Sequence, residues 1–112
     1  MFHSLLRSFK HAFRGLKTTI KTEATFRLHI FIAILVIIFA WQRQVDEKSW
    51  LILLLVIAFI LSLEIINSAV ERLVDILAPR THAFAKEIKD LLAAMVLLAS
   101  LFALVIGLII FF

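Results

Sequence analysis

The sequence predicts an all-α membrane protein with three transmembrane helices behind an N-terminal amphipathic helix. Apolar residues make up 63% of the 112 residues and the mean hydropathy is +1.08, whereas a soluble domain is roughly 45–50% apolar. Small soluble domains bury only about 60% of the surface that their unfolded chains expose. Long apolar runs also recur three times along the chain. We therefore expect a single membrane domain over residues 1–112, with lipid covering its apolar surface.

Composition excludes several kinds of site. The chain has no cysteine, which rules out disulfides and thiolate metal ligands. Gly15 and Gly107 are the only glycines and Pro79 is the only proline, so a Gly-rich phosphate loop is excluded. The net charge is +4. Because the basic residues lie beside hydrophobic spans, anionic lipid headgroups are the expected partner and nucleic acid is not.

Residues 2–22 have the period of a helix lying in the membrane surface. Its apolar side chains fall within roughly 40° of one direction at about 100° per residue: Phe2, Leu5, Phe9, Phe13, Leu16 and Ile20. Its basic side chains cluster about 120° away: Arg7, Lys10, Arg14, Lys17 and Lys21. This pattern is typical of an interfacial helix whose rings point into the membrane. A basic coat with no further role is the alternative.

Three stretches are apolar enough to cross a bilayer, and the transmembrane helices are expected at 24–41, 50–68 and 91–112. The first of these requires Arg27 and His29 to snorkel or to face protein. The connections are expected to be a polar turn, 42–49, and a loop containing Pro79, 77–89. Ten of the twelve Lys and Arg residues lie on the side of the N-terminus and the second connection. This asymmetry predicts that both are cytoplasmic.

A polar stripe extends the middle span without a helix breaker before Pro79. On a helical wheel one face carries five polar side chains: Glu64, Asn67, Ser68, Glu71 and Asp75. Glu64 lies about 21 Å along the helix from Trp50 and is therefore still inside the hydrocarbon. An ionised carboxylate near the bilayer centre costs roughly 2.5–3.5 kcal/mol. Glu64 is therefore the leading candidate for a functional group, with general base as a role open to it.

Other charged residues stand at the same membrane level. Glu23 is at the entrance to the first span, and Lys89 and Asp90 are at the entrance to the third. Glu23 and Glu71 together could hold Mg²⁺, which needs few protein ligands and bridges to phosphates. Lys89 could then neutralise phosphate charge. In the alternative reading the chain is a non-catalytic membrane assembly subunit, and its polar stripe only sets oligomer contacts. The histidines at 3, 11, 29 and 82 have no metal-ligand spacing.

Four segments resemble the prokaryotic diacylglycerol kinase and undecaprenol kinase family, which consists of small three-span lipid kinases. The most specific is residues 64–75, EIINSAVERLVD, which is similar to the family signature E-x-x-N-S-A-x-E-x-x-x-D. Three supporting segments agree in order and spacing: 9–15 (FKHAFRG), 21–27 (KTEATFR) and 85–90 (AKEIKD). The resemblance covers roughly residues 7–100.

The resemblance implies an ATP- and Mg²⁺-dependent kinase of a membrane lipid alcohol, either diacylglycerol or undecaprenol. It also implies a homotrimer in the bacterial inner membrane, with active sites between subunits on the cytoplasmic side. Glu64 would be the catalytic base, and Asn67 and Ser68 would bind the lipid with it. Glu23 and Glu71 would bind the metal. The nucleotide would be bound by these two and by His11, His82, Lys89 and Asp90.

Two departures concern the lipid. His29 stands where the diacylglycerol branch tends to have Glu, and Leu92-Ala93 replaces a Gly-Ser pair of that branch. The segment around His29 is closer to the undecaprenol kinase branch.

Overall fold

The computed structural model describes residues 1–77 and 83–112, and this part of the chain is entirely helical apart from short connections. Its helices are α1 (Phe2–Thr22), α2 (Ala24–Gln42), α3 (Glu47–Leu77) and α4 (Ala83–Phe111). Among the described residues, α2, α3 and α4 are the three helices long and apolar enough to cross a membrane. The all-α prediction is therefore confirmed, with α1 and α2 within one residue of their predicted bounds.

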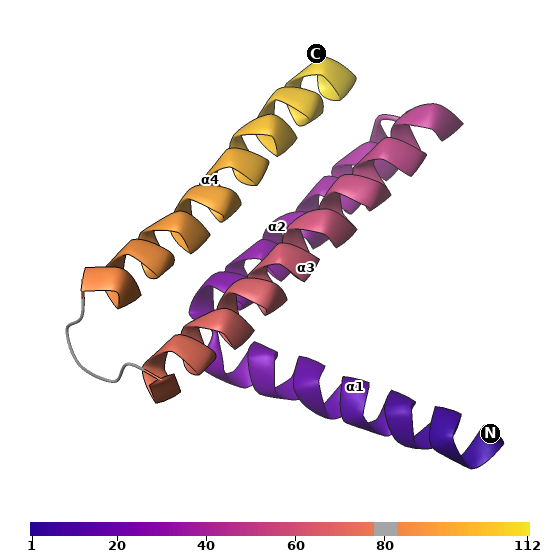
Figure 1. Ribbon diagram of the computed structural model, residues 1–112. Helices are drawn as coiled ribbons and strands as arrows, with labels where there is room; N and C mark the ends of the chain where they lie inside the picture. Colours follow the sequence, from indigo (N-terminus) through magenta and orange to yellow (C-terminus); the bar gives the residue numbers. More distant parts are fainter. Residues whose placement is uncertain (78–82) are drawn as a thin grey trace.

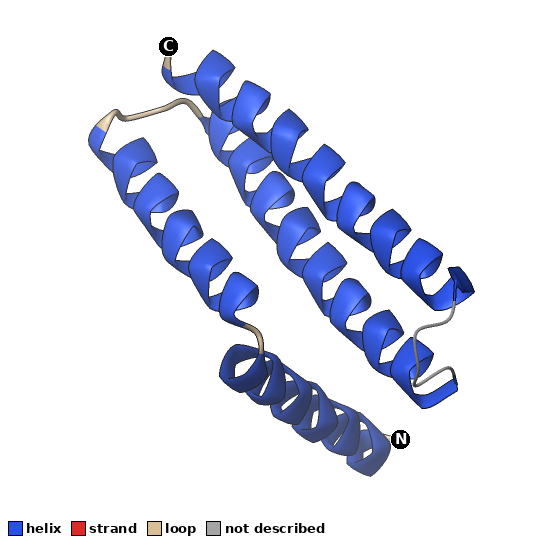
Figure 2. Cartoon of the chain, turned by 90° about the vertical axis from the view of Figure 1, so that its left-hand side faces the viewer, coloured by secondary structure: helices blue, strands red, loops and turns tan. Residues whose placement is uncertain are grey.

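The three long helices run side by side, and α3 lies between α2 and α4 (Figures 1 and 2). The helix α1 leaves the bundle at one end and runs across it at a steep angle, while the C-terminus lies at the opposite end (Figure 1). The apolar residues predicted to face the membrane from α1 are all exposed: Phe2, Leu5, Phe9, Phe13, Leu16 and Ile20. This arrangement agrees with an interfacial helix attached to a membrane-spanning bundle.

A single residue makes the sharp turn between α1 and α2. Glu23 has an extended backbone (φ −110, ψ 104) and ends α1 with an N–H that donates to the Thr19 carbonyl. Arg27 reaches back from α2 and donates to the carbonyls of Ile20 and Lys21 at 2.7 and 3.0 Å. These carbonyls lack partners within α1, and a cation is favourable at this negative end of the helix. Arg27, predicted to snorkel or to face protein, contacts protein here and stabilises the elbow that presents Glu23.

At the end of the bundle away from α1, Arg43 links the end of α4 to the end of α2. Its guanidinium donates to the Phe111 carbonyl at 3.1 Å and lies 5.3 Å from the centre of the Phe39 ring. The neighbouring Asp46 accepts the Ser49 N–H and so caps the start of α3. The hydrogen bonds with Ser49 lower the pKa of Asp46, which keeps this carboxylate ionised. The C-terminal end of α4 is therefore attached to the connection between α2 and α3.

Two predicted connections were too long. The expected loop 77–89 is wrong over 83–89, because α4 already begins at Ala83. This segment consists largely of good helix formers and contains an i,i+4 ion pair between Lys86 and Asp90 at 3.1 Å. The turn expected at 42–49 is also shorter, because α3 begins at Glu47 and α2 ends at Gln42. At both places charged residues end the apolar pattern of the sequence, but the helix continues through them.

Few side chains are buried within one chain. The buried apolar residues of the described part are Phe26, Ala40, Leu53, Val74 and Ala85. Buried polar side chains are Thr19, Glu64 and Ser68, two of which belong to the stripe on α3. The outer surface of the long helices is mostly large apolar side chains. A single chain thus buries Glu64 and Ser68 of its polar stripe and leaves its apolar surface for lipid or for further protein.

Candidate active site

A groove with both polar and apolar walls lies at the α1 end of the bundle and holds about 460 Å³. We call it the polar groove. It is lined by side chains from the start of α2, from the stripe on α3 and from α4: Glu23, Thr25, Phe26, His29, Glu64, Asn67, Glu71, Ala93, Val96, Leu97 and Ser100. Three stripe residues, Glu64, Asn67 and Glu71, are spaced by three and four positions and therefore share one face of α3. The structure brings them together with Glu23 and His29.

Glu64 is the most buried charged residue of the stripe, with 6% of its surface exposed. Its Oε2 atom lies 2.7 Å from Nδ1 of His29. This separation is within the range of an ion pair. A histidine that can carry charge therefore faces the carboxylate inside the apolar bundle.

Three buried polar atoms meet in the polar groove without a hydrogen bond to any residue that the structure describes. They are Nδ1 of His29, Oε2 of Glu64 and Oδ1 of Asn67. Leaving a buried donor or acceptor unpaired costs about 1–3 kcal/mol. Nδ1 of His29 and Oε2 of Glu64 face each other, so Oδ1 of Asn67 is the atom left for a bound molecule to satisfy.

Glu23 is held at the edge of the polar groove by α3. The Ser68 hydroxyl donates to Oε1 of Glu23 at 2.7 Å, and the Arg72 guanidinium lies 3.7 Å from the same oxygen. Arg72 also donates to the Thr22 hydroxyl at 2.8 Å. These contacts connect the elbow between α1 and α2 to the middle of the stripe. Ser68, predicted to bind substrate, contacts Glu23 and is not part of the groove wall.

The two carboxylates of Glu23 and Glu71 line the same groove. No cluster of three or more His, Cys, Asp or Glu side chains able to hold a metal occurs in residues 1–77 and 83–112. Two carboxylates nevertheless fit Mg²⁺, which keeps several waters and takes phosphate oxygens as further ligands. The donor set therefore suits a metal that arrives with a phosphate compound.

Of the predicted nucleotide residues, Glu23 and Glu71 line the polar groove, whereas His11, Lys89 and Asp90 do not. Lys89 donates to Asp75 at 2.7 Å, and the contact raises the pKa of Lys89, which stands at the water-side end of α4 before the apolar span. Asp90 pairs with Lys86. His11 is exposed on α1, and His82 lies outside the described residues. One chain thus brings together the base and metal candidates but not the other nucleotide candidates.

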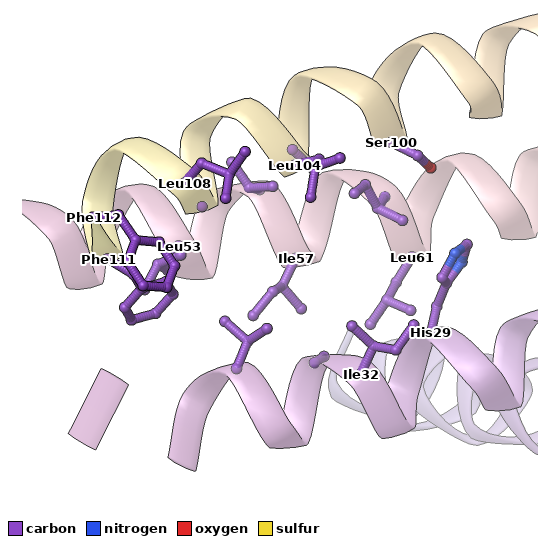
Figure 3. A pocket seen from close by; sticks show the side chains of 16 residues that line it. His29, Ile32, Leu53, Ile57, Leu61, Ser100, Leu104, Leu108, Phe111 and Phe112 are labelled. Carbon is purple, nitrogen blue, oxygen red and sulfur yellow. The ribbon is translucent and has the colours of Figure 1, made fainter. Parts of the chain in front are cut away.

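A second groove continues from the first toward the other end of the bundle (Figure 3). It holds about 440 Å³, and we call it the apolar groove. His29 and Ser100 line both grooves and lie together at one end in Figure 3, while Phe111 and Phe112 lie at the other. Leu53, Ile57, Leu61, Leu104 and Leu108 lie between them. The polar groove is thus continuous with a long apolar groove, whose lining suits a hydrocarbon chain.

His29 lines the site although the sequence predicted only that it snorkels or faces protein, because the histidines have no metal-ligand spacing. The position of His29 in the sequence could have identified it as a site residue. His29 falls within the first apolar span, and an ionisable side chain at membrane depth is expected to face a partner. Glu64 was the acidic side chain predicted at a comparable depth.

The chain is similar to known proteins over nearly its whole length. Residues 10–111 match the family described as prokaryotic diacylglycerol kinase. The chain is 36% identical to the undecaprenol kinase of Bacillus subtilis, with 94% of this chain and 85% of the relative covered. It is 33% identical to a diacylglycerol kinase of Synechocystis, covering 93% of this chain and 60% of the relative. With the diacylglycerol kinase of Escherichia coli K12 the identity is 27%, over 93% and 85% of the two chains.

Removing the hydroxyl that holds Glu23 should destabilise the site. Hydrogen bonds to charged groups contribute roughly 1.5–3 kcal/mol to stability. Because Glu23 is partly exposed, we expect Ser68→Ala to lower the free energy of unfolding by about 1 kcal/mol. Ser100→Ala is the matched control, because no side-chain hydrogen bond of Ser100 occurs within the described ranges. Denaturant unfolding in detergent micelles measures both. Equal losses would contradict a structural role for the Ser68–Glu23 contact.

Proposed function

Because the chain belongs to the prokaryotic diacylglycerol kinase family and is a lipid kinase, we propose that it transfers the γ-phosphate of ATP to the hydroxyl of a membrane lipid alcohol. The observation that carries the proposal is the buried Glu64 carboxylate in a polar groove that shares His29 and Ser100 with an apolar groove. Family membership favours this reading over the non-catalytic assembly subunit.

In the proposed reaction Glu64 is the general base. The lipid hydroxyl enters the polar groove beside Glu64 and Asn67. Glu64 accepts the hydroxyl proton as the oxygen forms a bond to the γ-phosphorus, and the bond from that phosphorus to the β-phosphate oxygen breaks to release ADP. Asn67 supplies an amide that orients the hydroxyl. The protein contributes position and a proton acceptor, which are its main roles in phosphoryl transfer.

Glu23 and Glu71 are proposed to hold the Mg²⁺ that accompanies ATP. When bound, the ion would neutralise phosphate charge. Ser68 and Arg72 keep one oxygen of Glu23 in place, so the carboxylate is already oriented before the nucleotide arrives. Lys89, Asp90, His11 and His82 remain proposals for the nucleotide contacts.

We propose a homotrimer whose sites lie between subunits. Two observations support it: the long helices expose most of their apolar surface in one chain, and the polar groove lacks Lys89 and Asp90 of its own chain. A neighbouring chain can supply the missing groups. We also propose that the N-terminus and the polar groove lie at the cytoplasmic side of a bacterial inner membrane, where ATP is available. The asymmetry of basic residues supports this orientation.

Undecaprenol is the proposed preferred alcohol. The relative named undecaprenol kinase is 36% identical, against 33% and 27% for the two diacylglycerol kinases. His29 in place of the acidic residue of the diacylglycerol branch points the same way. Rates on undecaprenol and diacylglycerol, measured side by side with ATP and Mg²⁺ in mixed micelles, test the choice. Transfer to neither lipid by folded protein would refute the proposal.

Replacing the base should abolish turnover and leave assembly intact. Glu64→Gln fills the same space but cannot take a proton, so the rate is expected to fall by about 10²–10⁴-fold. Glu47→Gln, at the opposite end of α3, is the control and should retain the wild-type rate. Initial rates and the oligomeric state in detergent are both measured. Loss of the oligomer with Glu64→Gln would instead support a purely structural stripe.

Weakening the metal site should change the Mg²⁺ requirement. In Glu71→Gln a neutral amide oxygen replaces a carboxylate, and the Mg²⁺ concentration for half-maximal rate is expected to rise at least about tenfold. The maximal rate should largely recover at high Mg²⁺. A titration of rate against Mg²⁺, with Glu47→Gln again as control, measures the shift. An unchanged half-maximal concentration would remove Glu71 from the metal site.

A further inference from the structure

We propose that His29 is a positioning residue that holds one oxygen of Glu64 so that the other oxygen receives the proton of the lipid hydroxyl. This inference rests on the proposed function of Glu64 as the base. His29 itself neither takes the hydroxyl proton nor contacts the phosphate.

The contact is specific to one pair of atoms. Nδ1 of His29 lies 2.7 Å from Oε2 of Glu64, and the Glu64 side chain is 7% exposed. Because Oε2 is buried against the ring, Oε1 is the oxygen left for a substrate in the polar groove. A carboxylate with one oxygen occupied cannot rotate freely, so its second oxygen keeps a defined direction.

The charges around the groove make this partner important. The other titratable side chains of the groove wall are Glu23 and Glu71, both acidic, and α4 contributes Ala93, Val96, Leu97 and Ser100. Of the residues that line it, His29 is the one side chain able to carry a positive charge, and it lies 2.7 Å from Glu64. In the low dielectric of an apolar bundle, a carboxylate without such a partner would be costly to hold in this orientation.

The place of His29 in the fold supports the same role. It lines both the polar and the apolar groove, so a lipid with its chain in the second and its hydroxyl in the first passes His29. Figure 3 shows the ring at that end of the apolar groove, across from Ser100. A side chain at this junction is well placed to align the base with the hydroxyl.

Three substitutions test the role. His29→Leu removes the polar contact, His29→Asn can keep an N–H near the place of Nδ1, and His29→Gln can place one nearer to Nε2. For His29→Leu we expect kcat to fall about 10–100-fold, as for a misplaced reacting group, with the KM for Mg²⁺-ATP within about twofold of wild type. His29→Asn should recover most of the loss and His29→Gln should recover little. Oligomeric state is checked for each variant.

The contact between His29 and Glu64 can also be tested by NMR, without measuring enzyme activity. In histidine-labelled protein, Glu64→Gln should shift the ¹⁵N signal of His29 Nδ1 and leave those of His3 and His11 in place. The positioning role would be overturned if His29→Leu kept the wild-type kcat, or raised the KM for Mg²⁺-ATP without lowering kcat. Equal recovery of kcat by His29→Gln and His29→Asn would overturn it too, as would a His29 signal that Glu64→Gln does not move. Absence of lipid phosphorylation by the wild type would refute the proposed function instead, and the ¹⁵N shift would still report on the contact.

Discussion

The cost of placing a carboxylate inside an apolar bundle is the constraint on which the rest of the site depends. Glu64 lies in the apolar part of α3, where solvation by water is lost, and an unpartnered ion would be expensive there. The chain meets this cost by turning the buried part of the stripe, Glu64 and Ser68, toward α2 and the elbow before it, where His29 and Glu23 contact it. The apolar side chains are left on the outside, an arrangement that is inverted relative to a soluble protein.

This constraint explains why the elbow between α1 and α2 is so firmly held. Arg27 closes the end of α1, and Arg72 and Ser68 bind Thr22 and Glu23 from α3. The elbow therefore belongs both to the fold and to the site: the same residue that turns the chain from the membrane surface into the bundle also lines the polar groove. A change in the angle of α1 would move a proposed metal ligand.

Much of this architecture could be predicted from the sequence because it depends on local patterns. Period and hydropathy identified α1 and the three spans, and spacings of three and four placed Glu64, Asn67 and Glu71 on one face. The contacts of Ser68 with Glu23, of His29 with Glu64 and of Lys89 with Asp75 join residues 14 to 45 positions apart. No periodicity encodes such pairings, because they depend on how the helices pack. The early starts of α3 and α4 were missed because hydropathy marks the membrane boundary and not the helix end.

The uninterrupted length of α3 has a consequence for membranes of different thickness. Its 31 residues span roughly 46 Å, well beyond a hydrocarbon core of about 30 Å. Glu64 and Glu71 are carried by this one rod about 10 Å apart along its axis. A thinner or thicker bilayer would be accommodated by tilting the rod as a unit. The depth of the reaction below the headgroups can therefore vary with lipid composition, while the spacing between its two carboxylates cannot.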